Sequence, residues 1–376
     1  MSSSSSDPSL EGRFRAIPAQ GFAEDDRLGL LSPVSGELIV LEGTARRIWQ
    51  KLEYPARLDE VSAALGAEYD APVETVIAGV RSIVPRLLDE GLVARATGGS
   101  DPNRDRYLRL LKRALANTLY PELELQIGFL ARGGEGLSGM ERERYLRDIE
   151  ERRPEDLAML IAAKQEGGSP WRFPHSMIGL FRLGNIEHCA ETVFAENIEG
   201  DFLEAGVCRG GATIFMRALQ VAHGETDRRT WVVDSFQGVP PSDKAVDRRY
   251  DVHLDESVSP WLACSERRVR DLFVRYDMLD SNVEFVAGWL AESLPAAPIG
   301  PLAILRLDVD LYSSTYEGLD LLYDKVSPGG FVIVDDYASF DCCRDAVDDF
   351  RDRHGIVEPI RWIDRRSVYW RKGGAA

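Results

Sequence analysis

The sequence has no excess of basic residues. Its 45 lysines and arginines are outnumbered by 62 aspartates and glutamates, which gives a formal net charge of −17 at pH 7. Binding to the phosphate backbone of a nucleic acid requires a basic face, and docking on anionic lipid requires clustered positive charge. We therefore expect neither a nucleic acid nor a membrane as partner.

Long apolar segments and paired cysteines are also lacking. The longest apolar runs have the length of a strand, as in Phe331–Val334, and are too short to span a bilayer. The N-terminus, a methionine and five serines, has neither the basic nor the apolar part of a secretory signal. The five cysteines are scattered without Cys-x-x-Cys spacing, which speaks against a zinc site and fits a reducing compartment. We expect a cytoplasmic protein with a disordered tail over residues 1–12.

The chain is long enough for two domains. With 376 residues it can bury more than one core. The stretch 97–103, Thr-Gly-Gly-Ser-Asp-Pro-Asn, is small, polar and rich in turn formers, as linkers are. We expect a small domain over residues 13–96, the linker over 97–103, a helical region over 104–199 and a larger domain over 200–376.

Residues 13–96 show a mixed pattern. Two β-type segments, at 28–32 and 37–41, are followed by helical patterns at about 44–52, 58–68 and 73–90. Gly91 is suited to end the last helix. Two strands followed by three helices predict a small winged-helix-like α+β domain.

Strands and helices alternate after residue 200. Five β-rich runs, beginning at Phe202, Thr230, Val283, Leu302 and Gly330, are separated by helical patterns, which predicts a parallel sheet with helices on both faces. Only three residues separate the last two runs, 359–363 and 367–370, too few for a parallel crossover, so they must form an antiparallel hairpin. This ending is typical of class I methyltransferases, whereas dinucleotide-binding domains lack it. We therefore predict an α/β, Rossmann-like class I methyltransferase sheet with a terminal antiparallel strand.

A glycine-rich turn follows the first of these strands. Glycines let the backbone approach a ligand, and the following helix offers free N–H groups to a carboxylate. The spacing is not Gly-x-Gly-x-x-Gly, so a dinucleotide fits less well. The turn could also be a tight connection without any ligand. An acidic residue at the end of the next strand, where it can accept hydrogen bonds from ribose hydroxyls, favours adenosine binding by this set: Glu204, Ala205, Gly206, Gly210, Gly211 and Asp234.

Four aspartates follow two later strands. Asp308 and Asp310 come after one strand, and Asp335 and Asp336 come after the next. The carboxyl ends of strands in open α/β sheets are where ligands bind, and carboxylates gathered there repel each other without a cation. Oxygen ligands of this kind suit Mg²⁺ or Mn²⁺. Any one of them could instead cap a helix.

These motifs together give the stretch 107–372 a resemblance to the macrocin O-methyltransferase family. The resemblance rests on Ser176–Gly179, Glu204–Ala212, Asp234–Gly238, Gly288-Trp289, Leu307–Tyr312 and Asp335–Tyr337. It implies S-adenosylmethionine against the glycine-rich turn and Asp234, a metal held by Asp308, Asp335 and Asp336, and a lid within residues 104–199. Further cofactor contacts are expected at Met177, Ser235, Gly288 and Trp289. Cys208 stands where the family pattern has a tryptophan.

The N-terminal segment has a resemblance of its own. Residues 28–93 are similar to the PqqD family of peptide-recognition modules, on the stretches Leu41–Ala45, Ile48-Trp49, Leu58–Val61 and Leu87–Val93. The resemblance implies that a leader peptide adds as a strand to the small sheet. A DNA-binding winged helix is the alternative, and the acidic surroundings disfavour it.

We therefore expect a metal-assisted O-methyltransferase of natural-product biosynthesis that forms a homo-oligomer. The metal would lower the pKa of the acceptor hydroxyl, and Asp308 or Asp310 would take the proton. In the first hypothesis the acceptor is a precursor peptide recruited by residues 13–96. In the second it is a small molecule such as a deoxysugar or a macrolide. In the third, the N-terminal peptide-binding module is the functional part, and the methyltransferase fold is an inactive scaffold.

Overall fold

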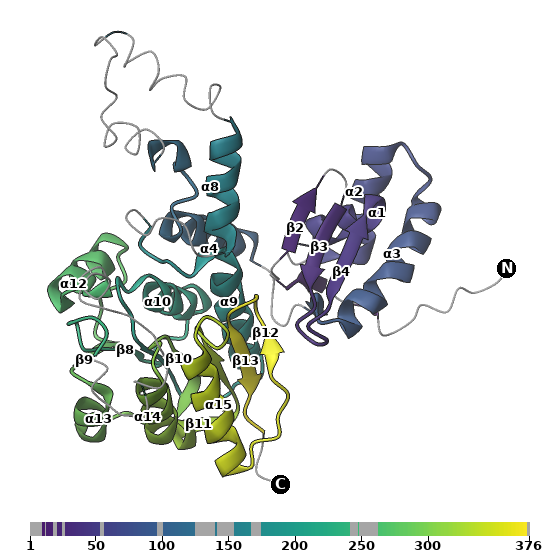
Figure 1. Cartoon of the computed structure of the whole chain (residues 1–376). Helices are drawn as coiled ribbons and strands as arrows, with labels where there is room; N and C mark the ends of the chain where they lie inside the picture. The colour runs from purple at the N-terminus through teal and green to yellow at the C-terminus, as the bar shows by residue number, and fades with distance from the viewer. Residues whose placement is uncertain are drawn as a thin grey trace.

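The computed structural model describes residues 10–11, 13–17, 21–24, 27–52, 56–95, 101–124, 140, 154–166, 174–240, 247 and 262–373. Figure 1 shows a main body built around one large sheet, with a smaller N-terminal lobe beside the sheet edge at β12. Most of the expected tail over residues 1–12, most of the expected linker and much of the stretch expected to hold a lid lie outside the described residues.

The large sheet has seven strands in the order β12-β13-β11-β10-β7-β8-β9. Neighbouring strands run parallel from β9 to β11, and β13 is antiparallel to both β11 and β12. The predicted hairpin and class I methyltransferase fold are thus confirmed. The antiparallel strand is second from the edge, and β12 forms the edge itself. The strands are β7 (Asp201–Ala205), β8 (Thr230–Asp234), β9 (Val283–Ala287), β10 (Leu302–Leu307), β11 (Val326–Val334), β12 (Arg361–Trp362) and β13 (Val368–Arg371).

The sheet is buried between two helical layers. Every residue of β10 is buried, including a single charged one, Arg306. Such continuous apolar runs are typical of parallel strands covered on both faces. One apolar core includes residues of α4 (Pro102–Leu115), α9 (Gly179–Ala195), α10 (Gly211–His223) and α12 (Glu266–Arg275). The other includes residues of α13 (Leu290–Ser293), α14 (Tyr312–Leu322) and α15 (Asp341–His354).

The N-terminal lobe, residues 13–95 where described, has its own core. Its helices α1 (Gly43–Lys51), α2 (Leu58–Tyr69) and α3 (Val73–Asp89) agree closely with the predicted ones. Strands β3 (Arg27–Leu31) and β4 (Leu38–Glu42) were also predicted, and β2 (Gly21–Glu24) joins them in one small sheet. A second small sheet, β5-β1-β6, was missed because its strands are very short: β1 (Arg13–Ala16), β5 (Ala56–Arg57) and β6 (Val93–Arg95).

The two parts are joined through α4. Its N-cap, Asp101, accepts hydrogen bonds from the backbone N–H groups of Asn103 and Arg104, and Pro102 occupies the first turn, where a missing N–H costs nothing. The last residues of the stretch predicted as a linker are therefore helical. One more described helix, α8 (Pro154–Glu166), precedes α9.

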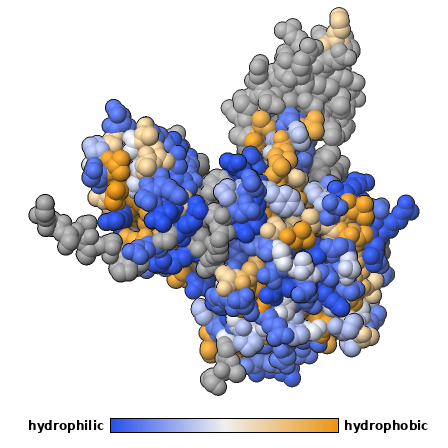
Figure 2. Space-filling model, turned by 180° about the vertical axis from the view of Figure 1, so that it is seen from behind, coloured by the Kyte–Doolittle hydropathy of each residue, from blue (hydrophilic) through white to orange (hydrophobic). Residues whose placement is uncertain are grey.

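The surface is mixed in character. On the face opposite to Figure 1, hydrophobic residues form small separate patches among hydrophilic ones (Figure 2). In the described part of the chain, no helix combines the length and apolarity that crossing a bilayer requires.

Candidate active site

A cavity of about 670 Å³ opens at the carboxyl ends of the parallel strands. Residues at or just after the carboxyl ends of β7, β8, β9, β10 and β11 line it, for example Gly206, Asp234, Trp289, Asp308 and Asp335. This is the edge at which open α/β sheets bind their ligands. Ten of the fourteen residues predicted for the site line this one cavity: Met177, Gly206, Asp234, Ser235, Gly288, Trp289, Asp308, Asp310, Asp335 and Asp336.

The glycine-rich turn forms one wall of the cavity. Gly206 has φ +83° and lies so close to the next loop that a Cβ would be 1.9 Å from the carbonyl oxygen of Asp308. The Asp234 carboxylate accepts hydrogen bonds from the backbone N–H groups of Val207 (2.7 Å), Cys208 (3.2 Å) and Phe236 (2.7 Å). Burial raises the pKa of Asp234. Asp234 therefore fixes the turn and also faces the cavity.

Four predicted cofactor contacts do not line the cavity: Glu204, Ala205, Gly210 and Gly211. Glu204 is buried, and its carboxylate accepts hydrogen bonds from the Thr213 hydroxyl and the Arg306 guanidinium. Its side chain thus faces the protein interior, where it holds Arg306, itself a hydrogen-bond donor to Asp308 and Asp335. Gly210 and Gly211 form the start of α10, and a Cβ on Gly211 would be 2.3 Å from the carbonyl oxygen of His175.

Three aspartates converge on one point of the cavity. One carboxylate oxygen each from Asp308, Asp335 and Asp336 can be chosen so that all three lie within 4.8 Å of one another. Burial and the neighbouring carboxylates raise the pKa of Asp308 and that of Asp336 well above the usual range. Oδ2 of Asp336 is buried and has no hydrogen-bond partner among the described residues. An unpaired buried carboxylate oxygen beside two more carboxylates fits a hard divalent cation.

Two arginines that sequence reasoning missed hold this cluster. Arg306, fully buried in β10, donates hydrogen bonds to Glu204, to Asp308 (3.0 Å) and to Asp335. Arg182, in α9, donates to the other carboxylate oxygen of Asp335 and, at 2.6 Å, to Asp364. Both oxygens of the Asp335 carboxylate thus have a guanidinium partner. A lone arginine inside an apolar strand, as in Leu305-Arg306-Leu307, was the available signal.

Asp310 lies next to the cluster in an unusual conformation. Its φ of +59° is in the left-handed region, in which residues other than glycine are uncommon. Burial, with a contribution from Asp308, raises the pKa of Asp310 to about 7. A carboxylate with that pKa can accept a proton near neutral pH.

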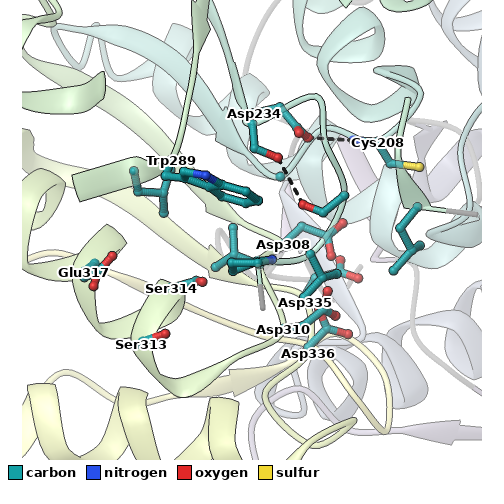
Figure 3. A pocket seen from close by; sticks show the side chains of 18 of the residues that line it. Cys208, Asp234, Trp289, Asp308, Asp310, Ser313, Ser314, Glu317, Asp335 and Asp336 are labelled. Atoms are coloured by element: carbon teal, nitrogen blue, oxygen red, sulfur yellow. Dashed lines mark hydrogen bonds between the residues drawn. The ribbon is translucent and has the colours of Figure 1, made fainter. Parts of the chain in front are cut away.

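The cavity has a second polar wall opposite the aspartates. Figure 3 shows Ser313, Ser314 and Glu317 of α14 on one side, and the four aspartates on the other. The indole of Trp289 points into the space between Asp234 and Asp308 (Figure 3). Hydroxyl and carboxylate groups beside an aromatic face are suited to orient a polar organic molecule.

His175, which precedes the Ser176–Gly179 motif, has its side chain in a separate hollow. Nδ1 of His175 lies 2.8 Å from the Tyr276 hydroxyl, in a smaller hollow next to Arg268 and Arg275. His175 does not line the cavity of about 670 Å³. His253 is outside the described residues.

Two family models match the chain. Residues 104–372 match the model described as macrocin-O-methyltransferase (TylF). Residues 28–93 match the model described as coenzyme PQQ synthesis protein D (PqqD). Both agree with the resemblances in the sequence motifs, and the first contains all the cavity residues named above.

Several curated proteins are similar in sequence. A tetracenomycin 4'-O-methyltransferase of Streptomyces olivaceus, whose named substrate carries a 2,3-dimethoxy-alpha-L-rhamnosyl group, is 43% identical over 277 residues, 73% of this chain and 95% of that protein. The demethyldecarbamoylnovobiocin O-methyltransferase of Streptomyces niveus is 49% identical over 201 residues, covering 53% and 76%. The mycinamicin III 3''-O-methyltransferase of Micromonospora griseorubida is 38% identical over 270 residues, covering 71% and 96%.

A solved structure agrees with the same fold. The O-methyltransferase NovP superposes with a TM-score of 0.59 at 39% sequence identity, over 72% of this chain and all of that one.

Proposed function

The chain belongs to the macrocin-O-methyltransferase (TylF) family and is an S-adenosylmethionine-dependent O-methyltransferase, and we propose that it methylates a sugar hydroxyl of a small-molecule natural product with the help of a divalent cation. One observation carries the proposal: the aspartate cluster and the glycine-rich turn with Asp234 line the same cavity. The methyl donor and the acceptor can therefore lie side by side. The names of the relatives, a rhamnosyl-tetracenomycin enzyme among them, support a small-molecule acceptor over a peptide.

The donor would occupy the wall formed by Gly206, Asp234 and Trp289. Asp234 offers carboxylate oxygens at the end of β8, where a ribose can donate hydrogen bonds. Gly206 lines the cavity with its backbone, because the absence of a side chain lets its turn lie directly against the Asp308 carbonyl group. Met177, Ser235 and Gly288 line the same cavity and complete the proposed donor site.

Asp308, Asp335 and Asp336 would hold Mg²⁺ or Mn²⁺. The cation would act as a Lewis acid that lowers the pKa of the acceptor hydroxyl. Ser313, Ser314 and Glu317 on the opposite wall would orient the acceptor. Holding both reactants in line supplies much of the rate acceleration in a direct transfer.

Asp310 is the better candidate for the proton acceptor. Asp308 is engaged by Arg306, whereas burial brings the pKa of Asp310 to about 7. We expect Asp310→Asn to lower kcat by about 10²–10⁴-fold, the usual contribution of a general base. Its affinities for S-adenosylhomocysteine and Mn²⁺ should stay near the wild-type values, as measured by calorimetry. A kcat within threefold of wild type would assign the proton to Asp308 or to solvent.

The acceptor class is tested with isotopically labelled S-adenosylmethionine. Purified protein is incubated with rhamnosylated aromatic polyketides and, separately, with precursor peptides encoded near the gene. We expect label on the glycoside in the presence of Mg²⁺, and loss of transfer in excess chelator. Label on peptides alone would overturn the small-molecule acceptor, and full activity in chelator would overturn the metal.

A peptide acceptor is the second candidate, and the outer edge of β4 favours it. Among the described strands β4 pairs only with β3, and its Leu38 and Val40 are 50% and 44% exposed. An exposed strand edge with apolar side chains can accept a further strand. In the same assay, Leu38→Arg should reduce labelling of a peptide but leave labelling of a glycoside unchanged.

A further inference from the structure

The N-terminal lobe is fastened to the main body by an ion-pair cluster. Arg15 of β1 lies 2.8 Å from a carboxylate oxygen of Glu187 and 2.6 Å from one of Glu191, both in α9. Lys112 of α4 also contacts Glu187. The side chains of Arg15, Glu187 and Glu191 are 12%, 2% and 14% exposed. Because this cluster is largely buried, removing one partner leaves an uncompensated buried charge, which is strongly unfavourable.

A second contact joins the lobe to the edge of the large sheet. The turn between β3 and β4 lies against β12, where the backbone N–H of Trp362 donates a hydrogen bond to the Pro33 carbonyl oxygen at 3.3 Å. Gly36 of the same turn lies beside the Trp362 ring, because a Cβ there would be in van der Waals contact with it at 3.5 Å. The lobe therefore covers the edge strand, which has two residues and pairs only with β13 within the sheet.

The connection between β12 and β13 reaches the aspartate cluster. Asp364 accepts hydrogen bonds from the N–H groups of Arg366 and Ser367, both at 2.8 Å, and from the Arg182 side chain at 2.6 Å. The Ser367 hydroxyl donates to the carbonyl oxygen of Asp335. The ring of Trp362 meets the ring of Tyr337, the residue after Asp336, edge to face at 5.8 Å. The edge strand and its turn thus support both aspartates.

We propose that the docked N-terminal lobe positions Asp335 and Asp336 by holding the β12–β13 turn against them, so that the lobe is part of the support of the active site. Helix α9 is already fixed by its apolar residues in the main core, so the Arg15 cluster serves to anchor the lobe. Both residues of β12 are half-buried and the strand lies at the edge of the sheet, so loss of the lobe from its outer side would make local opening of this edge easier. The contact from Pro33 and Gly36 restrains that opening. The consequence for metal affinity depends on the proposed metal site, whereas the restraint on the turn does not.

The test uses the full chain with Arg15→Glu combined with Gly36→Val. The first change reverses the charge that faces Glu187 and Glu191, and the second puts a side chain at φ +71° against Trp362. Arg27→Glu is the matched control, because Arg27 pairs with Glu42 within the lobe and is 64% exposed. Adding Glu191→Arg to Arg15→Glu should re-form an ion pair.

Three measurements are made on each protein. Small-angle scattering reports docking of the lobe, hydrogen exchange reports the opening of the Arg366 and Ser367 amides, and Mn²⁺ titration reports metal affinity.

We expect the double variant to have a larger radius of gyration, faster exchange at residues 366–367, and Mn²⁺ affinity about 10–100-fold weaker, as when support of metal ligands is lost. Its affinity for S-adenosylhomocysteine should stay within about twofold of wild type, because the proposed donor site rests on other strands. The control should match wild type, and the charge-swapped protein should recover. An undocked lobe with unchanged exchange and unchanged Mn²⁺ affinity would overturn the proposal, as would faster exchange and weaker Mn²⁺ binding while the lobe stays docked. Faster exchange in a protein that never binds Mn²⁺ would support the positioning and remove the metal from the proposed function.

Discussion

Asp336→Asn should lower kcat/KM for methyl transfer by about 10²–10⁴-fold at saturating Mg²⁺. The Asp336 side chain has the one carboxylate oxygen of the cluster that is buried without a partner, and the pKa of this residue is raised by burial and by Asp310 and Asp335. An amide of the same shape keeps the packing but removes the negative charge that a cation needs. The loss corresponds to several kcal/mol of Lewis-acid stabilisation. The measurement is a steady-state assay over a range of Mg²⁺ concentrations.

The control for this variant is Asp341→Asn, at the exposed start of α15. That side chain is 75% exposed and pairs only at the surface with Arg344, so kcat/KM should be unchanged. Affinity for S-adenosylhomocysteine should be wild-type in both variants. If Asp336→Asn keeps full activity at low Mg²⁺, the cluster does not hold a catalytic cation.

Gly206→Ala should destabilise the protein by more than about 4 kcal/mol. A Cβ at this position would be 1.9 Å from the Asp308 carbonyl oxygen, and the φ of +83° already excludes most side chains. Neither residue can move away easily, since the backbone of each is held by the buried strand that it follows, β7 for Gly206 and β10 for Asp308. Losses of this size are rare for a single methyl group and come from such clashes and backbone strain. Urea denaturation followed by circular dichroism measures the difference.

Gly224→Ala is the control that separates the cost of a left-handed backbone conformation from the cost of the steric clash at Gly206. Gly224 has φ +74° at the end of α10, and no atom lies within 4 Å of the position of an added Cβ. Its alanine variant should therefore lose only the left-handed penalty of about 1–2 kcal/mol. Equal losses in the two variants would mean that the approach of the two turns at Gly206 is not tight.

Sequence patterns predicted the parts of the molecule that depend on periodicity. Continuous apolar runs predicted β7 to β11, and the three-residue spacing before Ser367 predicted the hairpin of β12 and β13. The convergence of Asp308, Asp335 and Asp336 was predicted because they follow adjacent strands, and the geometry agrees. Four-residue strands such as β1 are too short for a period to be recognised. In β1 only two buried residues alternate with Arg13 and Arg15.

The support of the site could not be predicted in the same way. Arg182 is 153 residues from Asp335 in sequence, and Asp364 is 182 from Arg182. Nothing local in the sequence pairs them, because their contacts depend on how α9 crosses the sheet. The contacts of Glu204 could not be predicted for a related reason: its position in the strand decides which side of the sheet its carboxylate faces, and Thr213 and Arg306 occupy that side.

The position of Arg182 has a consequence for exchanging parts between related enzymes. The strand-and-helix series begins at Asp201, so residue 200 is a natural point at which to join two sequences. A chimaera joined there would take α9 from one parent and Asp335 and Asp364 from the other. The Arg182 guanidinium and its two carboxylate partners would then come from different parents, so their hydrogen-bond geometry would not be matched. The transferable unit therefore begins before Ser176, upstream of the helix that carries Arg182.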